Sequence, residues 1–438
     1  MSRGGLSPRM LLWTAFVVFC TLGMAYRPFV ALRLPVVGHV TNYQALLVVA
    51  TLLGSVTLMR MAGNPERSVP RTMCRILIAY LLFEILVVIP VAIWLGTDTV
   101  NTILGGMAVR LTWLLFPVML RLCADDRVRR AAGVVAVVAA VCLCVWGVYS
   151  AATSGAGYYL EFGYLRYRVL YGGALALFAW PFVLTVSQAS RRWYAAALLC
   201  VSLVGLVLTN MRSGYIAYAI AGLACLAMSG QIRRVVPWVA LVASVAAVGW
   251  LLWGQLASGV FGYTLSHFFD VSSGNGADRI TRDVLAWDFF ARYPFNDYVW
   301  SWRTYLVNLP NAFGPHNFVL NVATTEGLAG LAFYGSMLTV AFRGAWKWGK
   351  RDAVARALVG YLIFYIVFQL ANGGWYDPIT MALFVAATAG LVARVNQLRA
   401  AEASSGLAGD AEYGSRRQRR FYNVHLPTGT ASEDGDAS

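Results

Sequence analysis

The feature that most constrains this chain is a series of about twelve apolar runs, each close to the ~20 residues with which a helix crosses the hydrocarbon core of a membrane. A helix satisfies its backbone hydrogen bonds internally, as the apolar interior of a bilayer requires. The runs therefore predict an all-α, polytopic integral membrane protein. They centre on Phe16, Val49, Leu82, Leu114, Val137, Leu177, Val201, Ile220, Val245, Leu331, Phe364 and Phe384.

The composition indicates the same class. Hydrophobic residues make up 59% of the 438 residues, charged residues only 13%, and the mean hydropathy is +0.62. A water-soluble domain of this size does not carry so apolar a surface. The first run lacks a small-residue cleavage site before Tyr26, so we expect a retained helix and not a signal peptide.

Arginine and lysine alternate between the connections. Of the 35 such residues, 25 fall at the N-terminus, in the C-terminal tail and in every second connection. Because cytoplasmic loops carry an excess of these residues, both termini are predicted to be cytoplasmic. The same bias accounts for most of the net charge of +15, so no nucleic-acid partner is expected. The remaining connections are then predicted to lie on the external side of the membrane, namely residues 27–42, 96–101, 150–168, 211–214, 257–315 and 372–377.

This topology predicts two regions. Residues 1–399 form a transmembrane domain with one large external loop, 257–315, and residues 400–438 form a disordered cytoplasmic tail. The seven cysteines lie in apolar spans or at cytoplasmic helix ends, so neither an external disulfide nor a zinc site is expected. No aspartate cluster is suited to magnesium, and no cofactor is predicted.

Three arginines are candidates for binding an anionic substrate on the external side. Arg212 lies where the seventh span ends and the eighth begins; the alternative is an arginine that reaches toward lipid head groups. Arg279 and Arg282 share a face of a predicted amphipathic helix that Asp278 caps. Guanidinium groups near a helix N-terminus suit phosphate, unless Asp283 and Asp288 neutralise them.

A histidine at the entry of the tenth span is the candidate base. His316 follows Pro315 and precedes Asn317, and imidazole accepts protons near neutral pH. We expect the same helix to carry Glu326 about three turns deeper, with glycines after it that permit close helix approach. A structural role for an interface histidine is the alternative.

Two ionisable residues lie inside predicted spans. Glu84 and Arg110 reach similar depths on consecutive antiparallel helices. Charges at such depth are costly and are usually paired, so an ion pair is the first interpretation and a polar path for a substrate the second.

These motifs together resemble the O-antigen ligase and polymerase superfamily. The resemblance rests on Arg212-Ser213-Gly214, on Arg279 about fifteen residues before Pro294, and on the segments 316–320 and 326–330. The shared motifs lie roughly within residues 201–334, and the rest of the chain resembles the family only in its topology. The family loop often follows its proline with a Gly-x-Gly turn, whereas residues 295–300 contain no glycine.

The resemblance implies an inverting, metal-independent glycosyltransferase of the bacterial inner membrane with a periplasmic active site. Its donor is a glycan on undecaprenyl diphosphate, and its acceptor is a sugar hydroxyl of the lipid A core in a ligase or of another lipid-linked glycan in a polymerase. By the same resemblance Arg212 and Arg279 hold the diphosphate, and we expect Arg282 to assist them because it lies one turn from Arg279. His316 accepts or orients the hydroxyl proton, supported by Asn317 and Glu326. A polysaccharide transporter or flippase is the non-enzymatic alternative, although no internal repeat supports it.

Overall fold

The computed structural model describes the backbone of residues 8–26, 30–34, 38–63, 68–90, 110–153, 158–161, 164–167, 170, 172–187, 192–209, 211–231, 275–295, 317–371 and 378–422. These residues are mainly helical. The elements up to residue 229 are α1 (Pro8–Tyr26), β1 (Val30–Leu34), β2 (Gly38–Thr41), α2 (Asn42–Ala62), α3 (Val69–Phe83), the π-helix η1 (Glu84–Val88), the 3-10 turn η2 (Thr112–Leu114), α6 (Leu115–Cys123), α7 (Asp126–Thr153), β3 (Tyr158–Glu161), β4 (Tyr164–Tyr167), the 3-10 turn η3 (Gly172–Ala174), α8 (Leu175–Ser187), α9 (Arg192–Thr209) and α10 (Arg212–Ser229). They are followed by α13 (Asn275–Arg292), α15 (Phe318–Thr325), α16 (Gly327–Phe342), α17 (Ala345–Arg351), α18 (Ala353–Leu370) and α19 (Pro378–Tyr422).

The predicted spans correspond to helices wherever the structure describes them. Of the twelve predicted centres, Val245 lies outside the described residues and the others lie in helical segments. Four helical segments are long and apolar enough to cross a membrane, namely residues 126–150, 327–351, 353–370 and 379–404. Five further apolar helices are shorter. The fold is therefore that of a helical membrane protein, and the count of twelve spans stays a prediction.

The strands form two small hairpins. β1 pairs with β2 and β3 with β4, both antiparallel, within connections that the alternation of charges predicts to be external. Tyrosine and other β-formers at 158–167 favour such pairing locally. These short hairpins lie in connections, and the described residues are mainly helical, so the predicted all-α class is confirmed.

The chain divides into two compact units, Met1–Val395 and Asn396–Ser438, and the boundary falls within α19. The predicted boundary near residue 400 is close to it. Residues 400–422 are helical, whereas the composition predicts a disordered tail. The alanine, glutamate and arginine residues of this stretch have high helix propensity, which can outweigh its few glycines.

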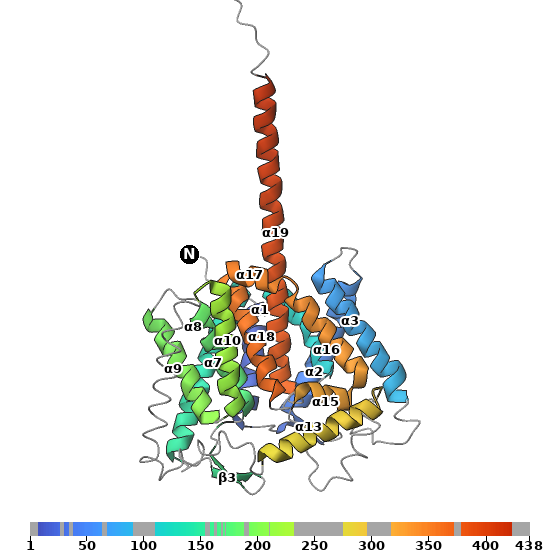
Figure 1. Cartoon of the computed structure of the whole chain (residues 1–438), viewed down its shortest axis with the longest axis vertical. Coiled ribbons are helices and arrows are strands. Elements are labelled where there is room, and N and C mark those ends of the chain that lie inside the picture. Colours follow the sequence, from blue (N-terminus) through green and yellow to red (C-terminus); the bar gives the residue numbers. More distant parts are fainter. Residues whose placement is uncertain are drawn as a thin grey trace, which may run out of the picture. The chain divides into compact units, whose positions relative to one another are not determined.

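The helices of the first unit pack as a bundle, which Figure 1 shows with α13 lying across one end. One group contains α2, α3, α6 and α16, and another contains α7, α8, α9, α10 and α18. Close approach depends on glycine: a Cβ at Gly54 of α2 would come within 2.7 Å of the Leu114 carbonyl carbon. In the second group Tyr218 of α10 stands edge-on to Phe364 of α18, with ring centroids 5.1 Å apart.

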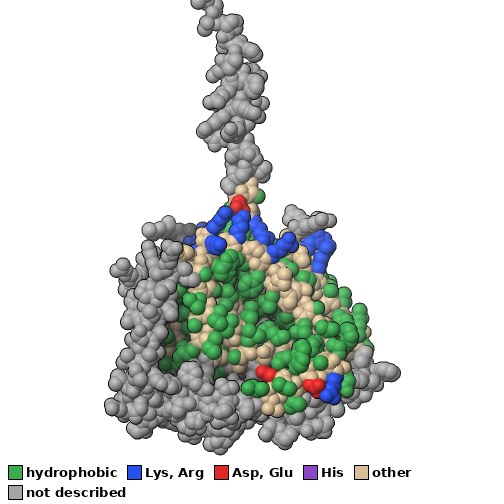
Figure 2. Space-filling model, in the orientation of Figure 1, with side chains coloured by type: hydrophobic (Ala, Val, Ile, Leu, Met, Phe, Trp, Pro, Cys, Tyr) green, Lys and Arg blue, Asp and Glu red, His purple; other side chains and the backbone are tan. Residues whose placement is uncertain are grey.

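The outward faces of the bundle are apolar. On α7, Val134, Val138 and Val145 are exposed at helical spacing, and on α2 Leu52 and Met59 are about two-thirds exposed. Figure 2 shows hydrophobic side chains over much of the visible side of the bundle. An apolar belt of this extent is typical of a protein that is surrounded by lipid.

Lysine and arginine gather at one end of the bundle, where Figure 2 shows them around the α17 end. α17 ends in Lys350 and Arg351, and α2 ends in Arg60. α13 lies across the opposite end (Figure 1). The described part of the bundle therefore has one basic end, as the alternation of charges in the sequence predicts.

Replacing Gly54 by alanine tests the packing of α2 on the segment 112–114. We expect Gly54→Ala to lower the free energy of unfolding by ~1–3 kcal/mol. The added Cβ would meet the Leu114 backbone, which cannot move aside as a flexible side chain can. Gly335 of α16 is the matched control, since nothing lies within 4 Å of its Cβ position. Gly335→Ala should leave stability unchanged or raise it by ~0.4–1 kcal/mol. Thermal unfolding in detergent measures both, and equal midpoints would contradict this packing.

Candidate functional site

A cluster of charged side chains lies buried inside the bundle. Arg110 Nη1 donates a hydrogen bond to Glu84 Oε2, and Arg110 Nη2 donates to the Thr325 carbonyl oxygen at 3.2 Å. Arg110 Nε lies 3.7 Å from Glu326 Oε1. The side chains of Arg110, Glu84 and Glu326 are only 2%, 1% and 1% exposed. The guanidinium group therefore lies between two carboxylates in a nearly water-free setting.

Aromatic residues surround this cluster. The Tyr80 hydroxyl donates a hydrogen bond to Glu326 Oε2. The Tyr80 ring stacks on Phe333 with centroids 4.1 Å apart, and Trp113 meets Phe333 edge-on at 5.4 Å. These rings keep the local dielectric low, which strengthens the attraction between the paired charges and makes an isolated charge very costly.

Two helix irregularities bring the carboxylates to Arg110. Glu84 opens the π-helix η1, and such segments shift the direction of a side chain within an otherwise continuous helix. Glu326 lies at a break between α15 and α16, where Gly327 has a φ of 56°, a conformation that favours glycine. Gly330 leaves room for the Glu326 carboxylate, since a Cβ there would lie 2.8 Å from Oε2. The prediction that Glu326 continues the helix begun after His316 is therefore wrong.

The predicted pair of Glu84 and Arg110 is confirmed, and Glu326 joins it as a third member. The reason that three groups meet is energetic: each buried charge costs several kcal/mol of desolvation, and only close oppositely charged partners offset that cost. Glu326 therefore lies in the bundle interior beside Arg110. Its predicted support of His316 stays untested, because residue 316 lies outside the described residues.

The helix α13 carries two of the candidate arginines. It begins at Asn275, so Asp278 lies in its first turn and does not cap it as predicted. Positions 279 and 282 are one turn apart in this helix, although the Arg279 side chain is outside the described part. Arg282, only 9% exposed, lies on the buried face with Ala286 and Phe289 at intervals of four and three residues.

Asp288, one of the two aspartates that were expected to neutralise these arginines, has another partner in the described part of the chain. Asp288 instead pairs with Arg292 one turn later, with Oδ2 and Nη2 2.8 Å apart, and both side chains are at least half exposed. Trp287 and Ile280 are also exposed, at 60% and 54%. α13 thus has a bundle-facing side with a buried arginine and an outer side with apolar residues, which is typical of a helix lying in a membrane interface.

α13 lies against the segment that follows the candidate histidine. It packs on α15, and the Leu328 backbone N–H at the start of α16 donates to the Pro294 carbonyl oxygen at 2.9 Å. Asn317 caps α15, since its Oδ1 accepts hydrogen bonds from the N–H groups of Val319 and Leu320 at 2.9 and 3.4 Å. The side-chain oxygen of Asn317 is thus used to begin a helix.

Arg212 is the first residue of α10, and its side chain is outside the described part. α10 ends beside α17, because a Cβ at Gly349 would contact Met228. Its first residue therefore lies at the end of the bundle opposite α17, which is the end where α13 lies (Figure 1). The structure brings Arg212, α13 and α15 to one end of the bundle.

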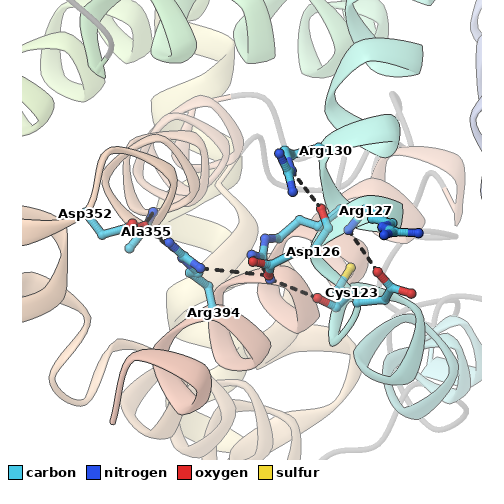
Figure 3. Close-up of polar contacts among 9 residues, drawn as sticks. Cys123, Asp126, Arg127, Arg130, Asp352, Ala355 and Arg394 are labelled. Carbon is cyan, nitrogen blue, oxygen red and sulfur yellow. Dashed lines mark hydrogen bonds and ion pairs between the residues drawn. The ribbon is translucent and has the colours of Figure 1, made fainter. Parts of the chain in front are cut away.

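A second polar cluster joins helix ends at the basic end (Figure 3). Arg394 Nη2 lies 2.6 Å from Asp352 Oδ2, and Arg394 Nη1 lies 3.9 Å from Asp126 Oδ1. Asp352 also accepts from the Ala355 backbone N–H at 2.8 Å. Burial alone raises the pKa of Asp352, but these hydrogen bonds and the nearby arginine charges outweigh it and hold that pKa below its usual value. Asp352 is therefore ionised at neutral pH, and its pair with Arg394 fastens the start of α18 to α19.

Sequence reasoning missed Tyr80 and the helix break. The signal for the break is the run Glu326-Gly327, followed by Gly330, within an otherwise apolar span. Tyr80 lies one turn before Glu84 on the same helix, so a buried partner for a buried carboxylate could have been sought there. No sequence signal links Glu326 to Arg110 or to Tyr80, which both lie more than two hundred positions earlier in the chain.

Removing the central guanidinium tests the buried cluster. We expect Arg110→Leu to cost ~3–5 kcal/mol of unfolding free energy, because it leaves two carboxylates buried beside each other. Adding Glu84→Gln and Glu326→Gln should restore part of this loss. Arg292→Leu is the control, since its exposed pair is worth at most ~1 kcal/mol. Thermal unfolding of the purified protein measures all three, and equal stability of Arg110→Leu and Arg292→Leu would refute the cluster's structural importance.

No family model matches the chain, and no curated protein matches it. The resemblance to the O-antigen ligase and polymerase superfamily therefore stays a prediction from the motifs at 212–214, 279–294 and 316–330. What stands established is a helical membrane protein with a buried ionic cluster and an arginine-bearing helix across one end.

Proposed function

We propose that the protein is an inverting glycosyltransferase that moves a glycan from undecaprenyl diphosphate to the hydroxyl of an acceptor sugar. The observation that carries this proposal is the contact between α13 and the α15–α16 segment, which includes the Leu328 to Pro294 hydrogen bond. The two motif-bearing parts of the chain, Arg279 to Pro294 and Asn317 to Gly330, are therefore neighbours in space. Sequence separation alone does not require this.

The charge distribution supports a periplasmic position for this region. Lysine and arginine gather at the α17 end of the bundle (Figure 2), and α13 lies across the other end (Figure 1). Under the positive-inside rule the α17 end is cytoplasmic. A lipid-linked donor presented at the outer face of a bacterial inner membrane would then meet α13 at the level of its head group.

The reaction needs fixed positive charge beside the leaving group. As the bond between the anomeric carbon and the phosphate oxygen breaks, negative charge accumulates on the diphosphate. Arg282 is already held in a low-exposure position on α13, and Arg279 and Arg212 belong to the same end of the bundle. Guanidinium groups bind phosphate oxygens in pairs, so they suit this role better than point charges do.

The acceptor hydroxyl attacks the anomeric carbon from the side opposite the diphosphate, which inverts the configuration. In this proposal the hydroxyl proton passes to His316, and the leaving group departs as undecaprenyl diphosphate. Asn317 contributes by beginning α15 at a defined point directly after the histidine. A ligase uses the lipid A core as acceptor, and a polymerase uses a second lipid-linked glycan; the ligase is our first choice.

A transporter or flippase is the second candidate, because one observation favours it. The break at Glu326 and the π-helix at Glu84 enclose a buried ionic cluster in the bundle interior. Broken helices around buried charges are typical of transport sites. The two candidates differ in product: a transferase makes a new glycosidic bond, whereas a transporter moves the lipid-linked glycan unchanged.

The arginines of α13 offer a matched test. We expect Arg282→Lys to lower glycan transfer by about tenfold to a hundredfold, because an ammonium group cannot make the paired contact with the diphosphate. Arg292→Lys, on the exposed side of the same helix, should transfer at the wild-type rate.

The His316→Ala variant should bind the donor yet react ~10²–10⁴-fold more slowly. The assay uses purified donor with either acceptor and measures product size.

Three results would count against the enzyme. Equal transfer by Arg282→Lys and Arg292→Lys would remove the diphosphate role, and wild-type rates in His316→Ala would remove the base. Movement of unchanged donor across liposomes, with no product from either acceptor, would favour the transporter.

A further inference from the structure

A second site lies at the basic end of the bundle, away from α13. A cavity of about 630 Å³ opens there between α1, α7, α8, α9, α18 and α19, and its lining residues all belong to the first compact unit. Its volume is that of a ligand pocket, whereas well-packed interiors leave few voids larger than a water molecule. We therefore expect a bound molecule to fill a cavity of this size beside a lipid-exposed surface.

The walls of the cavity away from the end of α7 are mainly apolar. They include Val137 of α7, Leu177 and Trp180 of α8, and Leu358 of α18. Val134, which also lines it, is 61% exposed, so the cavity opens sideways onto the lipid-facing surface of α7. Such a wall suits hydrocarbon and offers few partners to a polar solute.

Charged residues gather where the cavity reaches the end of α7. Three arginines, Arg129, Arg130 and Arg394, line it together with a single aspartate, Asp126. Arg129 and Arg394 are paired with Asp126. Arg130 is exposed, and its Nε donates to the Asp126 carbonyl oxygen at 3.3 Å (Figure 3). The mouth is therefore positive overall, with Arg130 accessible to an anion.

The depth of the cavity matches one membrane leaflet. Its lining runs from Asp126 to Val137 on α7 and from Arg394 back to Leu383 on α19. Eleven residues of helix rise ~16 Å, which is about half of the ~30 Å hydrocarbon core. A molecule whose anionic head lies at Arg130 would therefore place a hydrocarbon chain along the cavity as far as the bilayer midplane.

We propose that this cavity binds an anionic phospholipid, with its phosphate on Arg130 and one acyl chain between α7, α8 and α18. The charge at the mouth selects the head group, since basic pockets between membrane helices attract anionic lipid heads. The proposal does not depend on the glycosyltransferase assignment, because the cavity lies at the end of the bundle opposite α13.

Native mass spectrometry of the full chain in detergent tests the proposal with phosphatidylglycerol and phosphatidylethanolamine as probes. Phosphatidylglycerol should bind about five- to tenfold more tightly, because only it carries net negative charge. Arg130→Ala should lower phosphatidylglycerol binding about fivefold, which corresponds to the loss of one basic group near the surface. The matched control is Arg127→Ala, three residues earlier, exposed and outside the cavity lining.

A variant that fills the cavity tests the acyl-chain part separately. Ala136 lines the cavity, so Ala136→Phe should lower binding of both lipids, whereas Val138→Phe on the outer face should not. Equal affinity for the two lipids, or equal effects of Arg130→Ala and Arg127→Ala, would overturn the head-group assignment. Displacement by millimolar inorganic phosphate would show a simple anion site, and unchanged binding in Ala136→Phe would show that the cavity holds no chain.

Discussion

The attraction between the Arg110 guanidinium and two buried carboxylates is the interaction on which the rest of the bundle depends. It fixes the depth at which α3, the helix leading into α6 and the α15–α16 segment meet, because none of these charges can be left alone in an apolar interior. The irregularities near it follow from the same need. A π-helix at Glu84 and a glycine-assisted break at Glu326 aim the carboxylates inward, and Tyr80 completes the hydrogen bonding of Glu326.

That break also links the interior to the candidate site. The helix begun by Asn317 ends at Thr325, and the next helix starts beside the end of α13. The position of α13 is thus tied to the buried cluster through a short run of residues. The two ends of the bundle then differ in chemistry: one has paired arginines and aspartates that close helix ends, and the other has an interfacial helix with an arginine on its inner face. Such a division suits a protein that meets different groups at the two faces of a membrane.

Much of this fold can be predicted from the sequence. Apolar runs indicate spans, alternating charges indicate the two sides, and buried charges such as Glu84 and Arg110 are expected to pair. The helix at 275–292 was also predictable from its spacing of apolar residues. The break at Glu326 was not, because a helix through apolar residues is the default and only the distant Arg110 makes the alternative favourable. The start of α13 before Asp278 likewise exceeds what short-range propensity decides, whereas the helical continuation of α19 to Tyr422 agrees with the helix propensity of its residues. For the candidate site, the sequence predicts the chemistry of the arginines and the histidine, while the contact between α13 and α15 comes only from the structure.

The central claim is that a lipid-linked diphosphate binds where α13 meets α15. Photo-crosslinking with a photoreactive polyprenyl diphosphate, followed by mapping of the labelled peptides, tests this claim most directly. The account predicts labels within residues 275–292 and 317–330, and their loss when unlabelled donor is added. Labels confined to the peptides that line the cavity at the basic end, such as those with Val137 and Leu358, would contradict it.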